Sequence, residues 1–553
     1  MLKSDKIPIT VGVVGHLDFI ATEEHRLQII KLFRDLASAY PVSPIYLFSS
    51  IAEGADRFVA SIFLDLKKKD EEYKNRFELI VPLPFNTDEY KKDFDGVSKH
   101  EFDELLKQAT RSFCIGCEGF ENDRPQQYLK AGKFVADSSI ILLALWDGEK
   151  GKKGGTKDII RHKIAGDDDN VAESTFEYDG TVFIMPCNRT STPAKVLNTE
   201  DNAEGLSLDM VLKDSAIKDV LEKIEEINSE SVIIGLPKLE KSQSYLFNIP
   251  EKLDAPQNSI LRWYSIFDTL SLSFREKDIT ITIWLFVIGF LLIVTLEIYS
   301  NVFLTNFVLG IAMLFNVFAT MIYFYSRIRK NHQKYLYNRT LAEALRIQFY
   351  WNIAGINKNV SDYILRIHRK DFTWVKHFLS AIYGITYNNK TISSGTIKDL
   401  NDNWVKNQAD FFKSSINRIT QQLNFYHKIS NTSFVLAFVL LVSIFFFSEY
   451  YKTNKFLNDL LVIIGTLLSL FALIRAYIQM KGYEQLLNQY ELMNVIYQRA
   501  ASKIIETDTY ELDPDQKILY LKELFFVIGK EALIENGNWY LIFKEKEPEI
   551  EGI

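Results

Sequence analysis

Residues 279–326 read ITITIWLFVIGFLLIVTLEIYSNVFLTNFVLGIAMLFNVFATMIYFYS, two apolar runs separated by a short polar segment that begins at Glu297. The runs 279–296 and 302–326 contain no charged residue. A bilayer core about 30 Å thick requires roughly 20 helical residues at about 1.5 Å each. This stretch therefore predicts a hairpin of two membrane-spanning helices with its turn at 297–301.

A second pair of apolar runs lies downstream. Residues 429–448 are uncharged, and residues 460–474 resume the apolar pattern, which continues past Arg475 to Met480. Arg475 must extend toward the membrane surface or face a water-filled interior. The alternative, four buried helices of a soluble protein, would give shorter helices of about 10 to 14 residues. The sequence thus predicts four spans, at 279–299, 302–326, 429–448 and 460–480.

Basic residues flank the first hairpin and predict its orientation, because Lys and Arg beside spans tend to stay in the cytoplasm. They are absent from its turn, and they precede the first span and follow the second: Arg275, Lys277, Arg327, Arg329, Lys330 and Lys334. The loop of the second hairpin is less polarised, since it holds both lysines and acidic residues. Residues 1–10 lack the apolar core of a signal peptide. We expect both termini in the cytoplasm.

Composition limits the partners of the chain. Its 553 residues carry a net charge of −7, without a basic block of the kind that binds duplex nucleic acid. Cys114 and Cys117 have the spacing of half a zinc site or of a redox pair. No second pair follows, so we expect no metal and no resident cofactor. A cytoplasmic setting also argues against disulfides.

Short β-branched and aromatic segments alternate with helical patterns through residues 8–190. The strand-like segments are 8–14, 45–49, 77–82, 139–145 and 181–186. The helix-like segments are 22–40, 52–68, 99–109 and 128–136. Alternation at this spacing indicates βαβ units. The predicted fold is a Rossmann-like α/β domain with a parallel sheet covered on both faces, followed by an all-α membrane domain of four spans with a helical cytoplasmic stalk.

Three glycine-containing loops follow these strands, at the edge where open parallel sheets bind ligands. Glycine lets backbone N–H groups approach an anion, and a helix that begins just after the loop adds its positive end. Thr156 would bond a phosphate oxygen, and Asp56 or Asp147 would accept from ribose hydroxyls. The alternative is a set of ordinary turns with capping side chains. The predicted ligand-binding residues are Gly15, His16, Asp18, Ser50, Glu53, Gly54, Asp56, Arg57, Asp147, Gly148, Gly154, Gly155 and Thr156.

The same loops resemble the SLOG superfamily, the Rossmann-like domains related to the LOG phosphoribohydrolases and the DprA proteins. The motifs are VGVVGHLD at 11–18, SIAEGADR at 50–57, PLPF at 82–85, ALWDG at 144–148 and GGT at 154–156. In SLOG sensors the domain binds a nucleotide-derived signal and is fused to an effector, often within bacterial anti-phage systems. The resemblance implies a second messenger made by a separate synthase, and a pocket lined by Gly15, His16, Ser50, Glu53, Gly54, Asp56, Gly154, Gly155 and Thr156.

Two departures from the SLOG pattern bear on activity. Many relatives have Arg after the Gly-His pair, where this chain has Leu17, so that phosphate contact is absent or comes from Arg57 or Lys157. The PGGxGTxxE pattern of the LOG enzymes is incomplete, because Asp158 and the residue after it stand where the catalytic glutamate is expected. We therefore expect binding without turnover and no enzyme. Glu53 leaves a membrane-anchored nucleotide N-glycosidase as the alternative.

Amphipathic helical segments flank both hairpins, at 258–277, 329–351, 404–428 and 482–505. This repeated unit resembles the two-span SLATT effector domains found beside SLOG sensors, here duplicated. The stretches behind the resemblance are Arg339 with 343–346, and GKEALIEN at 529–536 with Trp539. SLATT domains are thought to form pores that depolarise or permeabilise the inner membrane. Four spans with little charge enclose no wide channel alone, so a pore implies a homo-oligomer, a dimer or a tetramer.

Polar residues on the second span, Asn306, Asn316 and Thr320, would face water or bond across helices. The predicted domains are 1–190 for nucleotide binding, 191–257 as a connection with a helix at 208–227, and 258–400 and 401–553 as the two membrane units. The sequence and the resemblance together predict a multi-pass protein of the bacterial inner membrane whose nucleotide ligand gates an ion path. A constitutive transporter with a regulatory nucleotide domain is a further alternative.

Overall fold

The computed structural model describes residues 6–116, 123–149, 154–165, 181–191, 208–248, 252–364, 369–388, 394–454, 456–507, 510 and 513–544. The chain forms two compact units. The first comprises Met1–Ile266 with Ala344–Ile392, and the second comprises Phe267–Glu343 with Ser393–Ile553. This division differs from the predicted boundaries, because the segment between the two hairpins groups with the first unit.

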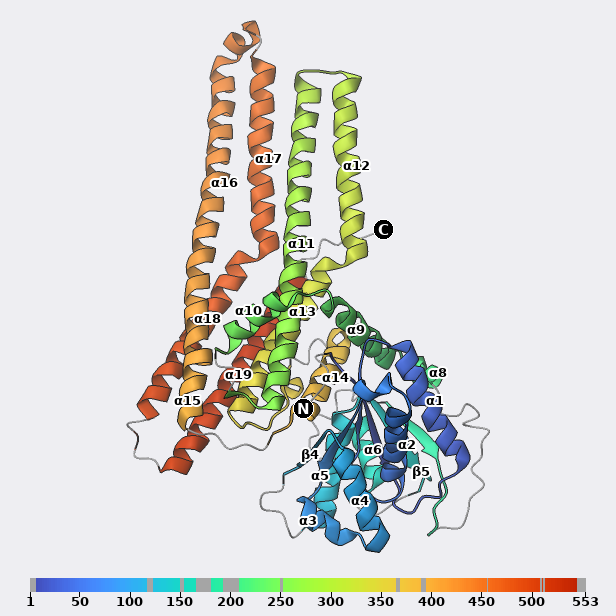
Figure 1. Cartoon of the computed structure of the whole chain (residues 1–553). Helices are drawn as coiled ribbons and strands as arrows, with labels where there is room; N and C mark the ends of the chain where they lie inside the picture. Colours follow the sequence, from blue (N-terminus) through green and yellow to red (C-terminus); the bar gives the residue numbers. More distant parts are fainter. Residues whose placement is uncertain are drawn as a thin grey trace. The chain divides into compact units, whose positions relative to one another are not determined.

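The first unit contains a six-stranded parallel sheet with the strand order β4-β3-β2-β1-β5-β6 (Figure 1). All four residues of β2 and all seven of β3 are buried, as expected for inner strands covered on both faces. This confirms the predicted Rossmann-like fold and its predicted strands. The strands are β1 (Ile9–Gly15), β2 (Ile45–Phe48), β3 (Phe77–Leu83), β4 (Arg111–Cys114), β5 (Ile141–Trp146) and β6 (Val182–Pro186).

Strand β4 is an element that the sequence analysis does not predict. Its four residues, RSFC, are only partly buried and lack the apolar run that marks the other strands. It lies at the edge of the sheet, where it pairs with β3 alone. An edge strand needs fewer apolar residues, since it has one neighbour and more access to solvent.

Helices cover both faces of the sheet. From β1 to β4 the chain advances in one direction, and from β4 it returns past β1 to β5 and β6. Right-handed crossovers therefore place the helices before and after this reversal on opposite faces. One ring contact illustrates the packing: the ring centroid of Phe33 in α1 lies 4.9 Å from that of Phe63 in α2. The helices are α1 (Glu23–Ala39), α2 (Ala55–Lys69), α3 (Thr87–Tyr90), α4 (Gly96–Gln108), α5 (Arg124–Asp137) and α6 (Thr156–Ala165).

The connection after the sheet is anchored at the amino ends of the strands. It forms α8 (Leu208–Lys213), α9 (Ser215–Ser231) and α10 (Leu236–Leu246), where the sequence predicts one helix over 208–227. Asn228 of α9 hydrogen-bonds both the N–H and the carbonyl of Ile7, at 2.8 Å each. Glu225 accepts from the N–H groups of Val42 and Ser43, at 2.8 and 3.0 Å. Helix α9 is therefore fixed to the edge of the sheet opposite the glycine-containing loops.

The segment between the two hairpins packs on the sheet. It includes α14 (Arg369–Thr386). The guanidinium of Arg111 in β4 donates to the carbonyls of Ile385 and Tyr387, and Phe113 stacks on the ring of Tyr387 at 5.3 Å. These contacts explain why residues 344–392 belong to the first unit.

The second unit is helical. It contains α12 (Asn306–Arg329), α15 (Ser394–Leu400), a π-helical segment (Asn401–Lys406), α16 (Asn407–Thr453), α17 (Leu457–Lys481), α18 (Tyr483–Glu506) and α19 (Pro514–Lys544). Two further helices belong partly to each unit along the chain, α11 (Ala255–Asn301) and α13 (Asn331–Ile353).

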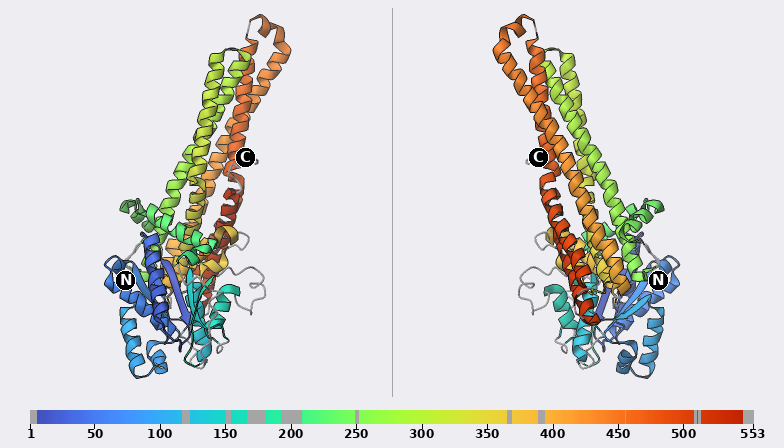
Figure 2. Two further views of the ribbon diagram at one scale, coloured as in Figure 1. Left: turned by 90° about the vertical axis from the view of Figure 1, so that its right-hand side faces the viewer. Right: turned by 90° about the vertical axis from the view of Figure 1, so that its left-hand side faces the viewer.

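Four helical stretches are long and apolar enough to cross a membrane: Ala255–Asn301, Asn306–Ile353, Gly395–Thr453 and Leu457–Glu506. Figures 1 and 2 show them as two hairpins, α11 with α12 and α16 with α17. In the most apolar window of α11 no residue is buried inside the protein. Apolar helices with so much uncovered surface suit a lipid environment rather than water. The chain thus has the build of a multi-pass membrane protein.

The turn of the first hairpin lies later than predicted. Helix α11 continues through Asn301, and Thr305 caps α12 by accepting from the Val308 N–H at 3.5 Å. The prediction of a turn at 297–301 is therefore wrong. Glu297 remains helical because its carboxylate accepts from Asn301 Nδ2 at 3.2 Å and lies against Gly465 of α17, where a Cβ would be 2.5 Å from Glu297 Cδ.

Arg475, the charge inside the fourth predicted span, has a partner on the neighbouring helix. Its Nη2 donates to Asn431 Oδ1 of α16 at 2.9 Å, and its guanidinium lies 5.7 Å from the centroid of the Phe471 ring. The side chain is thus held by a cross-helix hydrogen bond and an aromatic contact.

The cysteines correct one expectation. Cys114 is disulfide-bonded, whereas Cys187 is free and buried. The expectation that the cysteines stay unpaired is wrong for Cys114, because a disulfide depends on local backbone geometry, which an argument from compartment does not consider. Cys117, the other member of the predicted redox or zinc spacing, lies outside the described residues.

Candidate functional site

The strand order places a topological switch point between β1 and β5. The chain leaves β1 toward β2 on one side, and it leaves β5 toward β6 on the other. The loops after these two neighbouring strands therefore diverge at the carboxyl edge of the sheet. In open α/β sheets ligands bind at such a switch point.

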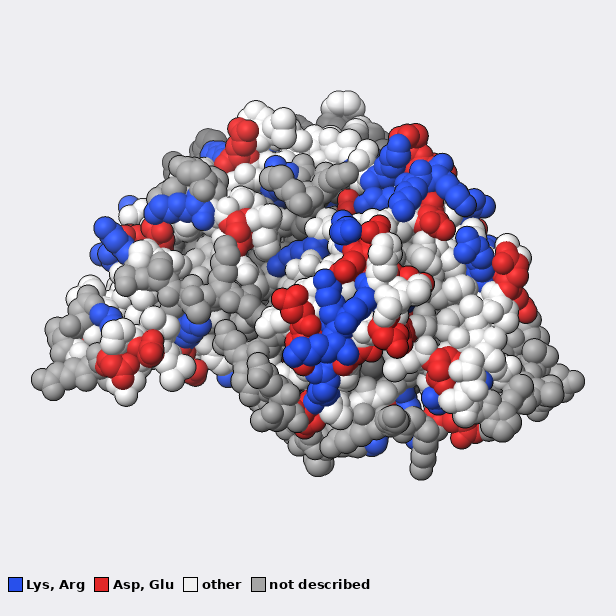
Figure 3. Space-filling model, turned by 60° about the horizontal axis from the view of Figure 1, so that its bottom comes forward, with Lys and Arg blue, Asp and Glu red and all other residues white. Residues whose placement is uncertain are grey.

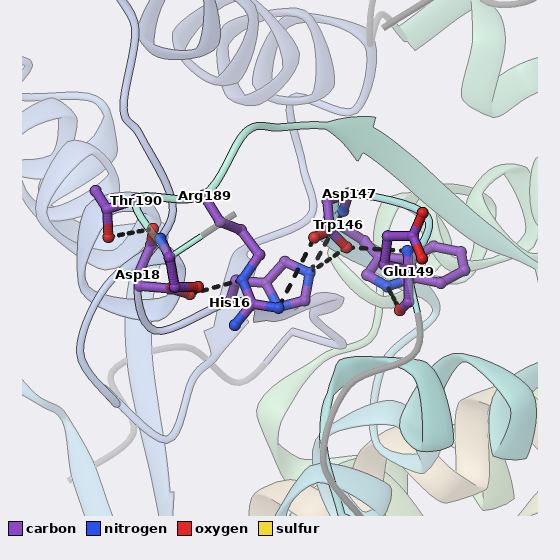
Figure 4. Close-up of polar contacts among 8 residues, drawn as sticks. His16, Asp18, Trp146, Asp147, Glu149, Arg189 and Thr190 are labelled. Carbon is purple, nitrogen blue, oxygen red and sulfur yellow. Dashed lines mark hydrogen bonds and ion pairs between the residues drawn. The ribbon is translucent and has the colours of Figure 1, made fainter. Parts of the chain in front are cut away.

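His16 and Asp147 meet at the switch point, although 131 positions separate them in the chain. His16 Nε2 lies 2.8 Å from Asp147 Oδ1, and both side chains are buried (Figure 4). The N–H of Glu149 donates to the same oxygen at 3.0 Å. Burial alone would raise the pKa of Asp147, but the hydrogen bonds from Glu149 and His16 and the charge of Arg189 lower it. Asp147 is therefore a carboxylate at neutral pH that orients the imidazole.

Arg189, which follows β6, completes the network. Its Nε donates to Asp18 Oδ1 at 2.8 Å, and its Nη1 lies 3.8 Å from Asp147 Oδ2 (Figure 4). The N–H of Thr190 donates to the Asp18 carbonyl at 2.9 Å. Burial would raise the pKa of Asp18, but the hydrogen bonds from Ser191 and Arg189 lower it to about 2. The loops after β1 and β6 are thus joined by an ion pair and by backbone bonds.

Arg189 is a site residue that the sequence analysis does not include. It lies three positions beyond Pro186, where β6 ends. The sequence position of Arg189 could have indicated its role, because a residue just after β6 lies at the carboxyl edge of the sheet, beside the other predicted loops. Its distance in sequence from Asp18 concealed the pairing.

Asp56, predicted as a ribose acceptor, is instead enclosed by its own loop. The backbone N–H groups of Ala52 and Ser50 donate to its carboxyl group. Burial raises the pKa of Asp56 to about 7, and these hydrogen bonds and the charge of Arg57 only partly offset that effect. Asp56 shapes the loop after β2 from inside.

Gly54 fits this loop against the loop after β1. Its φ of +77° lies in the left-handed region, and an added Cβ would be 2.2 Å from the Leu17 carbonyl oxygen and 2.4 Å from that of His16. The N–H of Ala55 donates to the His16 carbonyl at 3.1 Å. The glycine therefore permits close contact between two loops and holds His16 in place.

Arg57 and Glu53 turn toward α4. Arg57 Nε donates to the Ile51 carbonyl at 3.0 Å, and Nη1 donates to the Ser98 carbonyl at 2.9 Å. The guanidinium lies 4.4 Å from the centroid of the Phe94 ring. Glu53 Oε1 accepts from the hydroxyl of Ser98. These internal partners give Arg57 and Glu53 roles in packing α4 against the loop after β2.

The third loop ends at the amino terminus of α6. Gly154 has φ +83°, and its N–H donates to Asp158 Oδ2 at 2.7 Å. Gly155 precedes Thr156, the buried first residue of α6. Gly148, after Asp147, has φ +82° and open space around it. The positive end of a helix favours an anion, so the phosphate expected from the sequence would lie at this end of α6, where the Asp158 carboxylate accepts from the Gly154 N–H.

Gly15 and Ser50 complete the predicted set. An added Cβ at Gly15 would lie 2.3 Å from Ala55 Cβ, so this glycine lets β1 approach the start of α2. Ser50 contributes its N–H to Asp56, as described above. Of the predicted residues, the structure therefore brings His16, Asp18 and Asp147 together. The predicted residues after β2 pack beneath them and hold the loop after β1 in place.

The assembled site carries two carboxylates, one guanidinium and one imidazole. Carboxylate oxygens accept hydrogen bonds from hydroxyl groups, and an imidazole both donates and accepts. Such a set suits ribose hydroxyls better than phosphates. Within the described residues, no group of three or more His, Cys, Asp or Glu side chains is placed to hold a metal ion.

Charged side chains elsewhere in the first unit form ion pairs. Arg124 of α5 contacts Glu89 Oε1 at 2.7 Å and also contacts Asp93, and Lys91 Nζ lies 2.7 Å from Asp103 Oδ1. On the face that Figure 3 shows, blue and red side chains of the described residues are interspersed.

No family model matches the chain, and no curated protein matches its sequence.

Proposed function

We propose that the chain is a nucleotide-gated effector of the bacterial inner membrane, with both termini in the cytoplasm. Its sheet unit binds a nucleotide-derived second messenger, and its spans open an oligomeric ion path that depolarises or permeabilises the membrane. The role in anti-phage signalling follows from the resemblance to SLOG sensors and SLATT effectors.

The observation that supports this proposal best is the network of His16, Asp18, Asp147 and Arg189 at the switch point of the sheet. A site at this place in a chain with four apolar helices suits a ligand sensor joined to a membrane device. Asp147 and Asp18 would accept from ribose hydroxyls. The amino end of α6, with Gly154, Gly155 and Thr156, would receive a phosphate.

Gating requires that the ligand binds the open state more tightly than the closed state. A shift from about 1% open to about 99% open needs a preference of about 10⁴-fold. Covalent continuity offers a route for such coupling, because α11 and α13 each belong in part to the sheet unit and in part to the helical unit.

Binding is tested with the purified full-length chain in detergent. The probes are ADP-ribose, a cyclic dinucleotide and a linear oligoadenylate, and the readout is the dissociation constant. We expect Asp147→Asn and Gly155→Glu to weaken binding of the active probe by about 10-fold or more, since a hydrogen bond to a charged group contributes about 1.5 to 3 kcal/mol. Asp65→Asn, at a half-exposed position on α2 away from these loops, is the matched control. Equal affinity in all variants would reject these loops as the ligand site.

Ion flux is tested in liposomes that contain the same variants. The active probe should trigger flux in the wild-type protein and in Asp65→Asn, while Asp147→Asn should need a higher probe concentration. Flux that is independent of every probe would instead favour a constitutive transporter.

The buried His16–Asp147 pair favours one second candidate, a membrane-anchored hydrolase of nucleotide N-glycosidic bonds. A carboxylate that orients an imidazole prepares it to accept a proton from an attacking water. In that case the probe would be consumed during incubation, and His16→Ala would abolish its consumption. Recovery of intact probe after flux would reject the hydrolase.

A further inference from the structure

Helix α12 is a predicted span that leaves most of its surface uncovered by the rest of the chain. Of its residues, Ala312 alone is buried against the rest of the chain, and every residue of this helix is described. Its surface is otherwise available to lipid or to another protein. The chemistry of that surface indicates which of the two covers it.

Asn316 lies near the middle of α12, ten positions after Asn306 and thirteen before Arg329. At about 1.5 Å per residue, this places it roughly 15 to 20 Å from either helix end, near the centre of a bilayer. The side chain is exposed, and among the described residues no protein group bonds its carboxamide. Its carbonyl oxygen on the backbone accepts from the Thr320 hydroxyl at 2.9 Å, one turn further along the same face.

Lipid tails offer no partner to a carboxamide. Transfer of such a group into hydrocarbon without a hydrogen bond costs about 4 to 8 kcal/mol, and polar residues in spans usually bond across helices. The opposite face of α12, about 160° around the helix, is apolar and carries Leu314 and Phe318. The polar face of α12 therefore suits protein contact, and the apolar face suits lipid.

We propose that two copies of this chain pair through α12, with Asn316 opposite Asn316 across a two-fold axis along the membrane normal. A carboxamide both donates and accepts, so two identical side chains at the same depth satisfy each other. A two-fold contact brings identical residues together, whereas a head-to-tail ring would join different ones. The inference rests on the proposed function only in that it takes the chain to insert into the membrane and to assemble with copies of itself. It adds the surface through which two copies meet.

The test is disulfide cross-linking of the full-length protein in native membranes. Asn316→Cys should give a covalent dimer on mild oxidation, and Phe318→Cys, on the opposite face, should not. The wild-type protein shows the background from its natural cysteines. A dimer from Phe318→Cys but not from Asn316→Cys would overturn the proposal, as would equal yields from both.

Two further measurements separate the interface from other roles of Asn316. Asn316→Leu should lower the fraction of dimer in detergent, by mass, at least several-fold, and Asn316→Gln should restore it. Labelling of Asn316→Cys by a membrane-impermeant charged thiol reagent would show a water-lined position and reject the pairing. These outcomes do not depend on a ligand: cross-linking without triggered flux would uphold the interface and count against gating, whereas flux without cross-linking would reject the interface alone.

Discussion

Asp56 and Asp147 have the same side chain and follow β2 and β5, the strands on either side of β1, yet their surroundings give them different chemistry. Asp147 remains a carboxylate because hydrogen bonds and Arg189 outweigh its burial. Asp56 is enclosed by the loop after β2, and burial raises its pKa to about 7. Asp147 therefore suits ligand recognition, whereas Asp56 makes the loop after β2 sensitive to pH.

This difference predicts a pH dependence of stability. Because folding raises the pKa of Asp56 from 3.8 to about 7, the folded chain retains a proton that the unfolded chain has lost. The free energy of unfolding should therefore fall as pH rises between about 4 and about 7, by at most about 4 kcal/mol. In the Asp56→Asn variant this position cannot ionise, so its melting temperature should fall much less between pH 5 and pH 8 than that of the wild-type protein. Asp65→Asn is the control and should behave like the wild-type protein. If the melting temperature of Asp56→Asn falls as much as that of the wild-type protein, the assignment of the pH dependence to Asp56 is wrong.

Two glycines of the site predict unequal costs for the same substitution. Gly54 and Gly148 both have positive φ, near +80°, but only Gly54 has backbone atoms where a Cβ would stand. Gly148→Ala should cost about 1 kcal/mol from conformational strain alone. Gly54→Ala should cost at least about 2 kcal/mol more, because it must separate the loops after β1 and β2. The readout is the melting temperature of each variant, and equal losses would contradict the proposed loop contact.

At the scale of elements, α14 shows that helices distant along the chain stabilise the sheet unit. It meets the end of α5 where Gly384 lies against Ser138, and its carboxyl end is held by Arg111 of β4. The position of α14 thus depends on one close glycine contact and on the edge strand that the sequence analysis does not predict.

Gly384→Ala should loosen this packing. Its Cβ would lie 2.2 Å from Ser138 Oγ and 2.3 Å from Ser138 Cβ, so the helices must move apart at a cost of about 1 to 3 kcal/mol. Hydrogen exchange should accelerate in α14 (Arg369–Thr386). The second substitution Ser138→Gly removes both contacting atoms and should restore slow exchange. Failure of this rescue would show that another contact limits the helix.

At the scale of the whole molecule, the four apolar helices make the chain a multi-pass membrane protein. The proposed orientation places the turn between α11 and α12 outside the cytoplasm. Leu304 in this turn and Ile328 near the end of α12 are equally exposed, at 78%. They therefore form a matched pair for a test of topology.

In intact cells an impermeant maleimide should label Leu304→Cys and should label Ile328→Cys only after the membrane is opened. The reverse pattern would place the termini outside. The wild-type chain is the control for its natural cysteines. Extraction at alkaline pH should leave all three proteins in the membrane fraction.

Local patterns made much of this fold predictable. Strand and helix positions in the sheet unit follow from runs of a few residues, and the spans follow from apolar length. Strand β4 lacks the apolar pattern of the other strands, because an edge strand needs little apolar character. The first turn lies later than its polar residues predict, because Glu297 finds partners on α11 and α17. In each case, contacts distant in sequence outweighed the local signal.

The parallel α/β unit, the four apolar helices and the loops where a ligand site would lie could all be predicted from local patterns, since periodicity and composition act over a few neighbouring residues. Which loop residues meet depends instead on how distant segments fold together. The return of the chain past β1 brings Asp147 and Arg189 to His16 and Asp18, while Gly54, Asp56 and Arg57 are drawn into loop packing. Strand order and close contact between distant segments set these outcomes, and neither is encoded in a local pattern.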